Sequence, residues 1–264
     1  MYNFSYEKVS SVAEAVEAMQ KAEDGKFVAG GQTMLPTMKH RLASPSDIID
    51  LSGVKNLRGI SCDENFVTIG AMVTHFCVAS SPEVRREIPA LAKLAGNIGD
   101  PAVRNRGTIG GSIANNDPAA DYPAAVIGLG AKVNTNKREI FGDEFFTGMF
   151  ETALEENEVI ISVSFPKTQI ASYMKFENPA SRYAVVGVFV AKFNDEVRIG
   201  VTGATACAHR GMRLEEALNS DFSPAAIDDV ELPVEKMNSD IHASAEYRAH
   251  LVKVMTRRAV EACN

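Results

Sequence analysis

Two Gly-Gly doublets, each beside an apolar stretch and each followed by a small hydroxyl residue, most strongly constrain how this chain can fold. Gly30-Gly31 is followed by Thr33, and Gly110-Gly111 is followed by Ser112. Glycine has no Cβ, so its backbone can take positive φ angles and can approach a ligand closely. Successive backbone N–H groups in such a turn form a concave site for an anion. Two such turns predict a ligand with two phosphates, held from two sides.

A single Gly-Gly doublet is ordinarily a tight turn, and this alternative stays open for each loop taken alone. The Rossmann fingerprint GxGxxG and the P-loop pattern are both absent from the two loops. Phosphate binding is instead expected from unpaired N–H groups, which glycine turns and helix starts offer. The hydroxyls of Thr33, Thr108 and Ser112 could add further donors. A side chain introduced at Gly31 or Gly110 is expected to intrude on the ligand.

The bulk composition excludes several classes of protein. The chain has 264 residues and a formal net charge of −7, with 45% hydrophobic and 23% charged residues. These proportions are ordinary for a globular protein of one large or two smaller domains. This acidic balance argues against nucleic acid as the main partner, because proteins that bind it usually carry a basic face. No apolar run approaches the roughly 18 residues needed to cross a bilayer, so no transmembrane segment is predicted.

The cysteines indicate neither a metal site nor a disulfide framework. Cys62, Cys77, Cys207 and Cys263 are scattered, and no CxxC pair occurs. Scattered thiols in a chain that shows no secretion signal are typical of the reducing cytoplasm, which is the expected location. His75 lies near Cys77, but a core or helix-cap role is the interpretation we favour for it.

The first fifty residues predict a small α/β unit. Ser11 followed by Glu14 is a capping-box pattern, and an amphipathic helix follows it. Residues 26–29 and 48–51 are apolar and short enough to be strands, and Pro36 suits the first turn of a second helix. A helix between two strands favours a parallel sheet.

The rest of the chain predicts a mixed region followed by a mainly antiparallel one. Residues 59–71 have the pattern of a hairpin, and apolar periodicity predicts helix between positions 82 and 95. A short buried helix at 122–129 is expected to be capped by Asp121. Further expected elements are strands near 133, 140 and 159–165, a hairpin of 183–193 with 197–205, a helix at 212–218, an irregular crossing at 221–240, and an amphipathic helix at 245–263 with Tyr247, Leu251, Val254, Met255 and Ala259 facing inward.

Seven short motifs occur in order along nearly the whole chain. They are AGGQT (29–33), MKHRL (38–42), IGA (69–71), TIGGS (108–112), NDPAAD (116–121), AEYR (245–248) and RRAV (257–260). With these motifs the chain resembles the FAD-binding medium subunit of molybdenum hydroxylases, most closely that of the carbon monoxide dehydrogenase type. The ordered set is far more specific than either glycine loop alone.

The resemblance implies an α+β fold with three parts. Residues 1–52 would form an N-terminal α/β FAD-binding subdomain, and residues 53–168 a second FAD-binding subdomain. Together they would make the two-subdomain fold of vanillyl-alcohol-oxidase-like flavoproteins, which clasps FAD between its halves. Residues 169–264 would form a C-terminal flavoprotein domain with a three-stranded sheet and helices.

The resemblance also implies which residues bind FAD. The two loops would hold the diphosphate, Asn115 and Asp121 would approach the ribityl chain or the flavin ring, and Lys175 would lie near the cofactor. Tyr183 would lie against one face of the isoalloxazine, and attachment would be noncovalent because neither loop contains His or Cys. The full expected set is Val28, Ala29, Gly30, Gly31, Gln32, Thr33, Met34, Leu35, Thr108, Ile109, Gly110, Gly111, Ser112, Asn115, Asp121, Lys175 and Tyr183.

The chain shows no nucleophile elbow and no convincing acid–base pair, so a cofactor must carry its chemistry. The resemblance implies an oxidoreductase subunit that passes electrons from the iron–sulfur clusters of a small subunit through FAD to an external acceptor. A large molybdopterin subunit would oxidise the substrate, in a dimer of heterotrimers. Two alternatives stay open: a free-standing FAD-dependent oxidase or reductase with its own substrate pocket, and a non-catalytic nucleotide-binding module.

Overall fold

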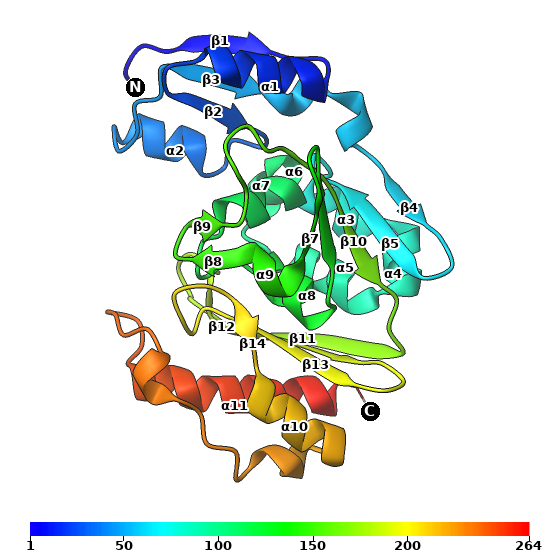
Figure 1. Ribbon diagram of the computed structural model, residues 1–264. Helices are drawn as coiled ribbons and strands as arrows, with labels where there is room; N and C mark the ends of the chain where they lie inside the picture. Colours follow the sequence, from blue (N-terminus) through cyan, green and yellow to red (C-terminus); the bar gives the residue numbers. More distant parts are fainter. Residues whose placement is uncertain (264) are drawn as a thin grey trace.

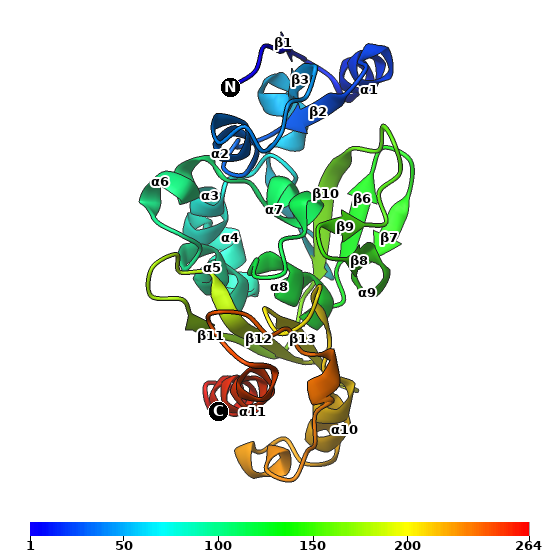
Figure 2. The same cartoon turned by 90° about the vertical axis from the view of Figure 1, so that its left-hand side faces the viewer.

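The computed structural model describes residues 1–263 and stacks three units along one long axis (Figure 1). An N-terminal unit with a parallel sheet lies at one end, a larger mixed unit lies in the middle, and a sheet with two helices forms the other end. The perpendicular view gives the same order (Figure 2). The N-terminus and the last helix therefore lie at opposite ends of the molecule.

The N-terminal unit is a parallel sheet, as the helix between two strands predicts, and the unpredicted strand β1 makes it three-stranded. Its order is β1-β3-β2, with β1 at Ser5–Lys8, β2 at Gly25–Val28 and β3 at Asp47–Asp50. Helix α1 (Val12–Lys21) begins after Ser11, whose hydroxyl accepts a hydrogen bond from the Glu14 amide. Helix α2 (Met34–Lys39) follows the first glycine loop, and the short 3-10 turns η1 (Leu51–Gly53) and η2 (Lys55–Leu57) lead into the middle unit.

The middle unit is built on a five-stranded antiparallel sheet with the order β4-β5-β10-β6-β7. The predicted hairpin at 59–71 is confirmed as the pair β4–β5. The strands are β4 (Ile60–Cys62), β5 (Phe66–Gly70), β6 (Lys132–Thr135), β7 (Glu139–Phe141) and β10 (Ile160–Pro166), with the small ribbon β8 (Phe146–Gly148) and β9 (Glu151–Thr152) nearby.

Helices surround this sheet, and one of them differs from the sequence prediction. The stretch expected as one helix is divided into two because Ile88 has φ −141° and ψ 71°, and the proline after it disfavours helical backbone there. The helices are α3 (His75–Ser80), α4 (Pro82–Glu87), α5 (Pro89–Gly96), α6 (Pro101–Arg106), α7 (Ile109–Asn115), α8 (Tyr122–Gly128) and α9 (Gly142–Phe145).

Helix α8 joins the middle unit to the C-terminal sheet. Every residue from Tyr122 to Gly128 is buried, and the helix packs directly on β13. A Cβ added at Gly200 would lie 2.0 Å from the carbonyl oxygen of Ala124, so only glycine allows this approach of helix and strand. The middle unit and the C-terminal sheet are therefore packed without a gap at this point.

The C-terminal unit has the three long strands expected, and the two-residue strand β14 adds to one edge of the sheet. The order is β11-β12-β13-β14, all antiparallel. Its elements are β11 (Ile170–Glu177), β12 (Ala184–Lys192), β13 (Val197–Thr202), β14 (His209–Arg210), α10 (Met212–Ser220), the 3-10 turns η3 (Pro224–Ile227) and η4 (Val234–Lys236), and α11 (Ala245–Glu261).

Helix α11 packs along the outer face of this sheet, and two residues of its AEYR motif have structural roles. Tyr247 was expected to face inward but is 43% exposed, with its ring edge-on to Phe176 at 6.1 Å. Arg248 is buried instead. Its Nη1 donates hydrogen bonds to the carbonyls of Val185 and Gly203, and its Nη2 bonds to Asp240 at 2.6 Å. Arg248 therefore ties the helix to the sheet.

Candidate functional site

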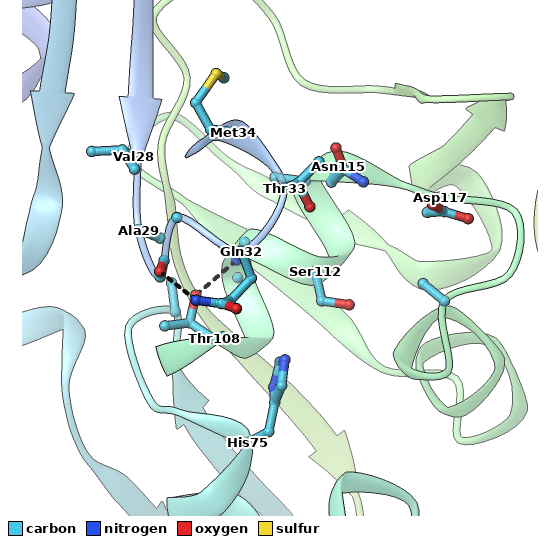
Figure 3. Close-up of a pocket in the computed structure, with 18 of the residues that line it drawn as sticks. Val28, Ala29, Gln32, Thr33, Met34, His75, Thr108, Ser112, Asn115 and Asp117 are labelled. Atoms are coloured by element: carbon cyan, nitrogen blue, oxygen red, sulfur yellow. Dashed lines mark hydrogen bonds between the residues drawn. The ribbon is translucent and has the colours of Figure 1, made fainter. Parts of the chain in front are cut away.

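The two glycine loops line the same cleft, which has a volume of about 440 Å³ and lies between the N-terminal and middle units (Figure 3). They also touch each other. A Cβ added at Gly30 would lie 2.1 Å from the carbonyl oxygen of Arg106, directly before the second loop. The absence of a side chain at Gly30 is thus what allows the loops to meet.

The first loop has unused hydrogen-bond donors. No backbone N–H of residues 30–34 donates to another group among the described residues, whereas the next amide, of Leu35, bonds to the carbonyl of Gly31. Gly31 has φ +72°, a conformation that favours glycine. Gln32 and Thr33 are exposed at the turn. This loop is therefore equipped to bind an anion with its backbone.

The second loop differs from the sequence prediction, because the backbone N–H groups of residues 109–112 are already bonded within the protein. Helix α7 begins at Ile109 after the cap residue Thr108, which pairs with Thr74 in the segment before α3. The bonds are Ile109 N to Val73 O at 3.1 Å, Gly110 N to Ala71 O at 2.9 Å, Gly111 N to Thr108 Oγ1 at 3.1 Å, and Ser112 N to Thr108 O at 3.0 Å. This wall of the cleft can bind a ligand with side chains such as Ser112 and Asn115, but not with those amides.

The expectation that side chains at Gly31 and Gly110 would intrude on the ligand also needs correction. A Cβ at Gly110 would lie 2.6 Å from the Cβ of Ala71 and 2.7 Å from its carbonyl oxygen, so it would press into the protein. A Cβ at Gly31 would meet the side chain of Leu35 at 2.8 Å. Both glycines therefore allow close packing of the loops.

The expected cofactor-binding residues gather at this cleft with three exceptions. Leu35 is on the outer side of the first loop and is 37% exposed. Ile109 is fully buried in the core beneath the second loop. Lys175 lies behind Asp121, with a side chain that is 5% exposed. The residues that do line the cleft are Val28, Ala29, Gly30, Gly31, Gln32, Thr33, Met34, Thr108, Gly110, Gly111, Ser112, Asn115, Asp121 and Tyr183.

Asp121 does not cap helix α8 as expected, because its carboxylate belongs to a buried polar cluster. Its Oδ1 accepts hydrogen bonds from the Tyr173 hydroxyl at 2.6 Å and from Lys175 Nζ at 3.0 Å. Burial raises the pKa of the Asp121 carboxyl, and the adjacent Lys175 ammonium opposes this. The cluster places a carboxylate at the cleft wall with its charge compensated from behind.

Lys175 also fixes the turn that carries Tyr183. Its Nζ donates to the carbonyls of Asn97 and Arg182, both at 2.9 Å. Arg182 has φ +62°, and Tyr183 follows it at the rim of the cleft, where it is 48% exposed. Burial, and then the charges of Asp117 and Asp121, raise the pKa of Tyr183, which therefore keeps its proton at neutral pH.

Sequence reasoning missed several residues that line the cleft. The apolar ones are Phe27, Leu51, Met72, Leu154 and Ile160, which come from separate parts of the chain. No local pattern distinguishes such residues from core. His75 is buried, which agrees with a core role, but it also lines the cleft, which the sequence did not predict. The residue that caps α3 is Thr74.

Asn116 follows the cleft residue Asn115 and ties this part of the chain to the β8–β9 ribbon. Its substitution gives a testable prediction. It has φ +43°, and its Nδ2 bonds to the carbonyls of Gly148 at 2.8 Å and Glu151 at 2.7 Å. Asn116→Ala should lower the free energy of unfolding by about 2–4 kcal/mol, since it loses two buried hydrogen bonds and strains the backbone. Asn116→Gly should lose less, because glycine accepts the positive φ. Urea denaturation measures both, and equal losses would contradict a backbone contribution.

Comparison with known proteins identifies the family. Residues 2–168 match the model of the FAD binding domain in molybdopterin dehydrogenase. The chain belongs to the family of FAD-binding medium subunits of molybdenum hydroxylases. The resemblance seen in the seven motifs is thereby confirmed, and with it the α+β flavoprotein fold, FAD as the cofactor and the assignment as an oxidoreductase subunit.

Similar proteins cover almost the full length of this flavin subunit. It is 35% identical to the nicotine 6-hydroxylase medium subunit of Paenarthrobacter nicotinovorans, over 97% of this chain and 95% of that protein. It is 34% identical to the carbon monoxide dehydrogenase medium chain of Hydrogenophaga pseudoflava, over 98% and 96%. The solved carbon monoxide dehydrogenase from that organism superposes with a TM-score of 0.90, over 99% of this chain and 97% of that one.

Residues 1–263 show neither a metal centre nor a membrane-spanning helix. No group of three or more His, Cys, Asp or Glu side chains is arranged to hold a metal ion within these residues. None of the helices described there is both long and apolar enough to cross a membrane. The cleft is therefore the candidate site of the flavin subunit.

Proposed function

We propose that the flavin subunit holds FAD in the cleft between the glycine loops and passes electrons through it from the iron–sulfur clusters of a small subunit to an external acceptor. The observation that carries this proposal is the row of free N–H groups at residues 30–34, which line the same cleft as Ser112 and Asn115. Each charge-assisted hydrogen bond from such a donor is worth about 1.5–3 kcal/mol. A diphosphate fits this donor set.

The cleft is lined by both apolar and polar side chains, which suits a flavin dinucleotide. The apolar side chains of Phe27, Leu51 and Leu154 suit a flat base. Asp121 and Tyr183 are polar lining residues, which we assign to the flavin side. In this assignment Leu35 and Ile109 support the loops from behind, and Lys175 acts through Asp121 and the turn at Arg182.

Bound FAD supplies the redox chemistry, because a flavin takes up electrons singly and releases them in pairs. The chain's own residues bind and position it. The first loop holds the diphosphate, Ser112 and Asn115 close the opposite wall, and the phenol of Tyr183 covers the rim and limits the entry of water. Lys175 holds the Tyr183 turn in place through the carbonyl of Arg182.

We further propose the assembly and the division of the chain. The relatives are named as medium subunits or chains, which supports a complex with a small iron–sulfur subunit and a large molybdopterin subunit, as a dimer of heterotrimers. Residues 1–52, 53–168 and 169–264 would be the three folding units, since each contains one of the larger sheets. The four free cysteines agree with a cytoplasmic location.

Titration of the full chain with FAD tests the cofactor assignment. We expect saturation at about one FAD per chain, with the absorbance spectrum of an oxidised flavin that bleaches on reduction with dithionite. A chain that takes up no FAD would refute the proposal. A redox-silent nucleotide complex would indicate a binding module instead.

Purification of the native complex tests the assembly. Iron and molybdopterin that co-purify with the chain would support the three-subunit complex. Turnover of a small-molecule substrate by the isolated, FAD-loaded chain would instead indicate a free-standing oxidase or reductase and would overturn the subunit assignment.

A further inference from the structure

His75 is a buried histidine at the cleft whose side chain has an unmet hydrogen-bond requirement. The residue is 4% exposed, it lines the cleft, and its Nδ1 is buried without a partner among the described residues. Figure 3 shows the imidazole pointing from the start of α3 toward the space between Thr108 and Ser112. Burying a polar group without a partner costs about 1–3 kcal/mol, so such a group in a native fold needs an explanation.

The protein around the ring holds it by packing. The ring of Tyr122 is tilted at 50° with its centroid 5.3 Å away, and the Tyr122 hydroxyl also lacks a partner among residues 1–263. On the other side, a Cβ at Gly107 would lie 2.6 Å from Nε2. The Nε2 edge of the ring therefore lies against the backbone that opens the second glycine loop, and glycine at 107 makes room for it.

The protonation of His75 follows from its surroundings. Burial, and to a lesser extent the charge of Arg104, lower the pKa of His75 to about 4, so the imidazole is neutral at physiological pH. A neutral imidazole has one N–H and one lone pair. An orphaned buried N–H is rarer in proteins than an orphaned acceptor. The proton is therefore placed on Nε2, and the partnerless Nδ1 is the lone pair.

We propose that the Nε2–H of His75 donates a hydrogen bond to a diphosphate oxygen of FAD, as a third binding element beside the two glycine loops. This inference rests on the proposed function. The ring points toward Thr108 and Ser112, on the wall opposite the free amides of the first loop. Because the amides of residues 109–112 are already bonded internally, the imidazole adds a donor to this wall beside the side chains of Ser112 and Asn115. An anionic oxygen is the acceptor that strengthens such a bond most.

His75→Phe tests the proposal in the full chain, because phenylalanine keeps a ring of similar shape and removes both nitrogens. We expect the Kd for FAD to rise about 10- to 100-fold, as for the loss of one hydrogen bond to a charged group. ADP, used as a second probe because it carries a diphosphate without the flavin, should lose a similar factor. The Tm of the FAD-free protein should stay the same or increase, since the orphaned Nδ1 is gone.

Two further variants complete the test. His75→Gln keeps one N–H donor and should recover part of the lost affinity. Tyr122→Phe removes the neighbouring orphaned hydroxyl and should leave the Kd for FAD within about twofold of the wild type.

Two results would overturn the inference. One is an FAD affinity of His75→Phe within about threefold of the wild type; the other is a loss for FAD without a loss for ADP. Either result, obtained with a wild-type chain that binds FAD, leaves the proposed function standing. A wild-type chain that binds no FAD would refute the proposed function itself.

Discussion

Gly30→Ala should weaken FAD binding by more than about 100-fold, because it removes one or two charge-assisted hydrogen bonds of the diphosphate site. The added Cβ would lie 2.1 Å from the carbonyl oxygen of Arg106 and 2.8 Å from the Cα of Gly107. Both neighbours are backbone, so the two loops must move apart. The free N–H groups of residues 30–34 would then be displaced relative to Ser112 on the second loop. Fluorescence titration with FAD measures the loss.

Gly96→Ala is the matched control for this variant. Gly96 ends helix α5, and a Cβ there would meet only the Cβ of Ala79 at 3.8 Å, which is an ordinary contact. Its FAD affinity should stay within about twofold of the wild type. Gly30→Ala should also lower the free energy of unfolding by about 1–3 kcal/mol through overpacking. An unchanged FAD affinity in Gly30→Ala would show that contact between the loops does not position the diphosphate donors.

Lys175→Met should lower the free energy of unfolding at neutral pH by about 3–5 kcal/mol, the usual cost of removing one partner of a buried ion pair. Both side chains of the pair are 5% exposed, and Asp121 would keep only the Tyr173 hydroxyl as a partner. The bonds from Lys175 to Asn97 and Arg182 would be lost as well, so the turn carrying Tyr183 would loosen. Urea denaturation measures the change in stability.

The pH dependence of Lys175→Met follows from the carboxyl left behind. Burial already raises the pKa of Asp121 above its unfolded value, and loss of the lysine raises it further. Between the unfolded and folded pKa values the folded state binds more protons, so stability falls as pH rises through this window. The defect should therefore be largest at neutral and higher pH, and it should shrink as pH falls and Asp121 becomes protonated.

The double variant Asp121→Asn with Lys175→Met is the control for this mechanism. It removes the uncompensated charge, so it should recover a large part of the stability lost in Lys175→Met, and its stability should depend less on pH. A double variant that is less stable than Lys175→Met at neutral pH would contradict an electrostatic cause. The loss would then reflect the missing contacts of the lysine to backbone carbonyls.

Local patterns in the sequence predicted most elements of the fold. The cap at Ser11, the hairpins β4–β5 and β12–β13 and the last helix all depend on residues close together in the chain. The break between α4 and α5 is also local, since Pro89 is visible in the sequence. The short strand β14 was missed because two residues are too few for a pattern of alternation.

By itself the sequence determined the family, the cofactor and the two glycine loops that line the cleft, because glycine doublets and ordered motifs are properties of short stretches. Only the tertiary structure decided how each group in these loops is used. The amides of Ile109 and Gly110 are bonded to the segment before α3, Asp121 pairs with Lys175 across the chain, and His75 lines the cleft. Hydrogen-bond partners and burial depend on segments far apart in sequence, so no local pattern records them.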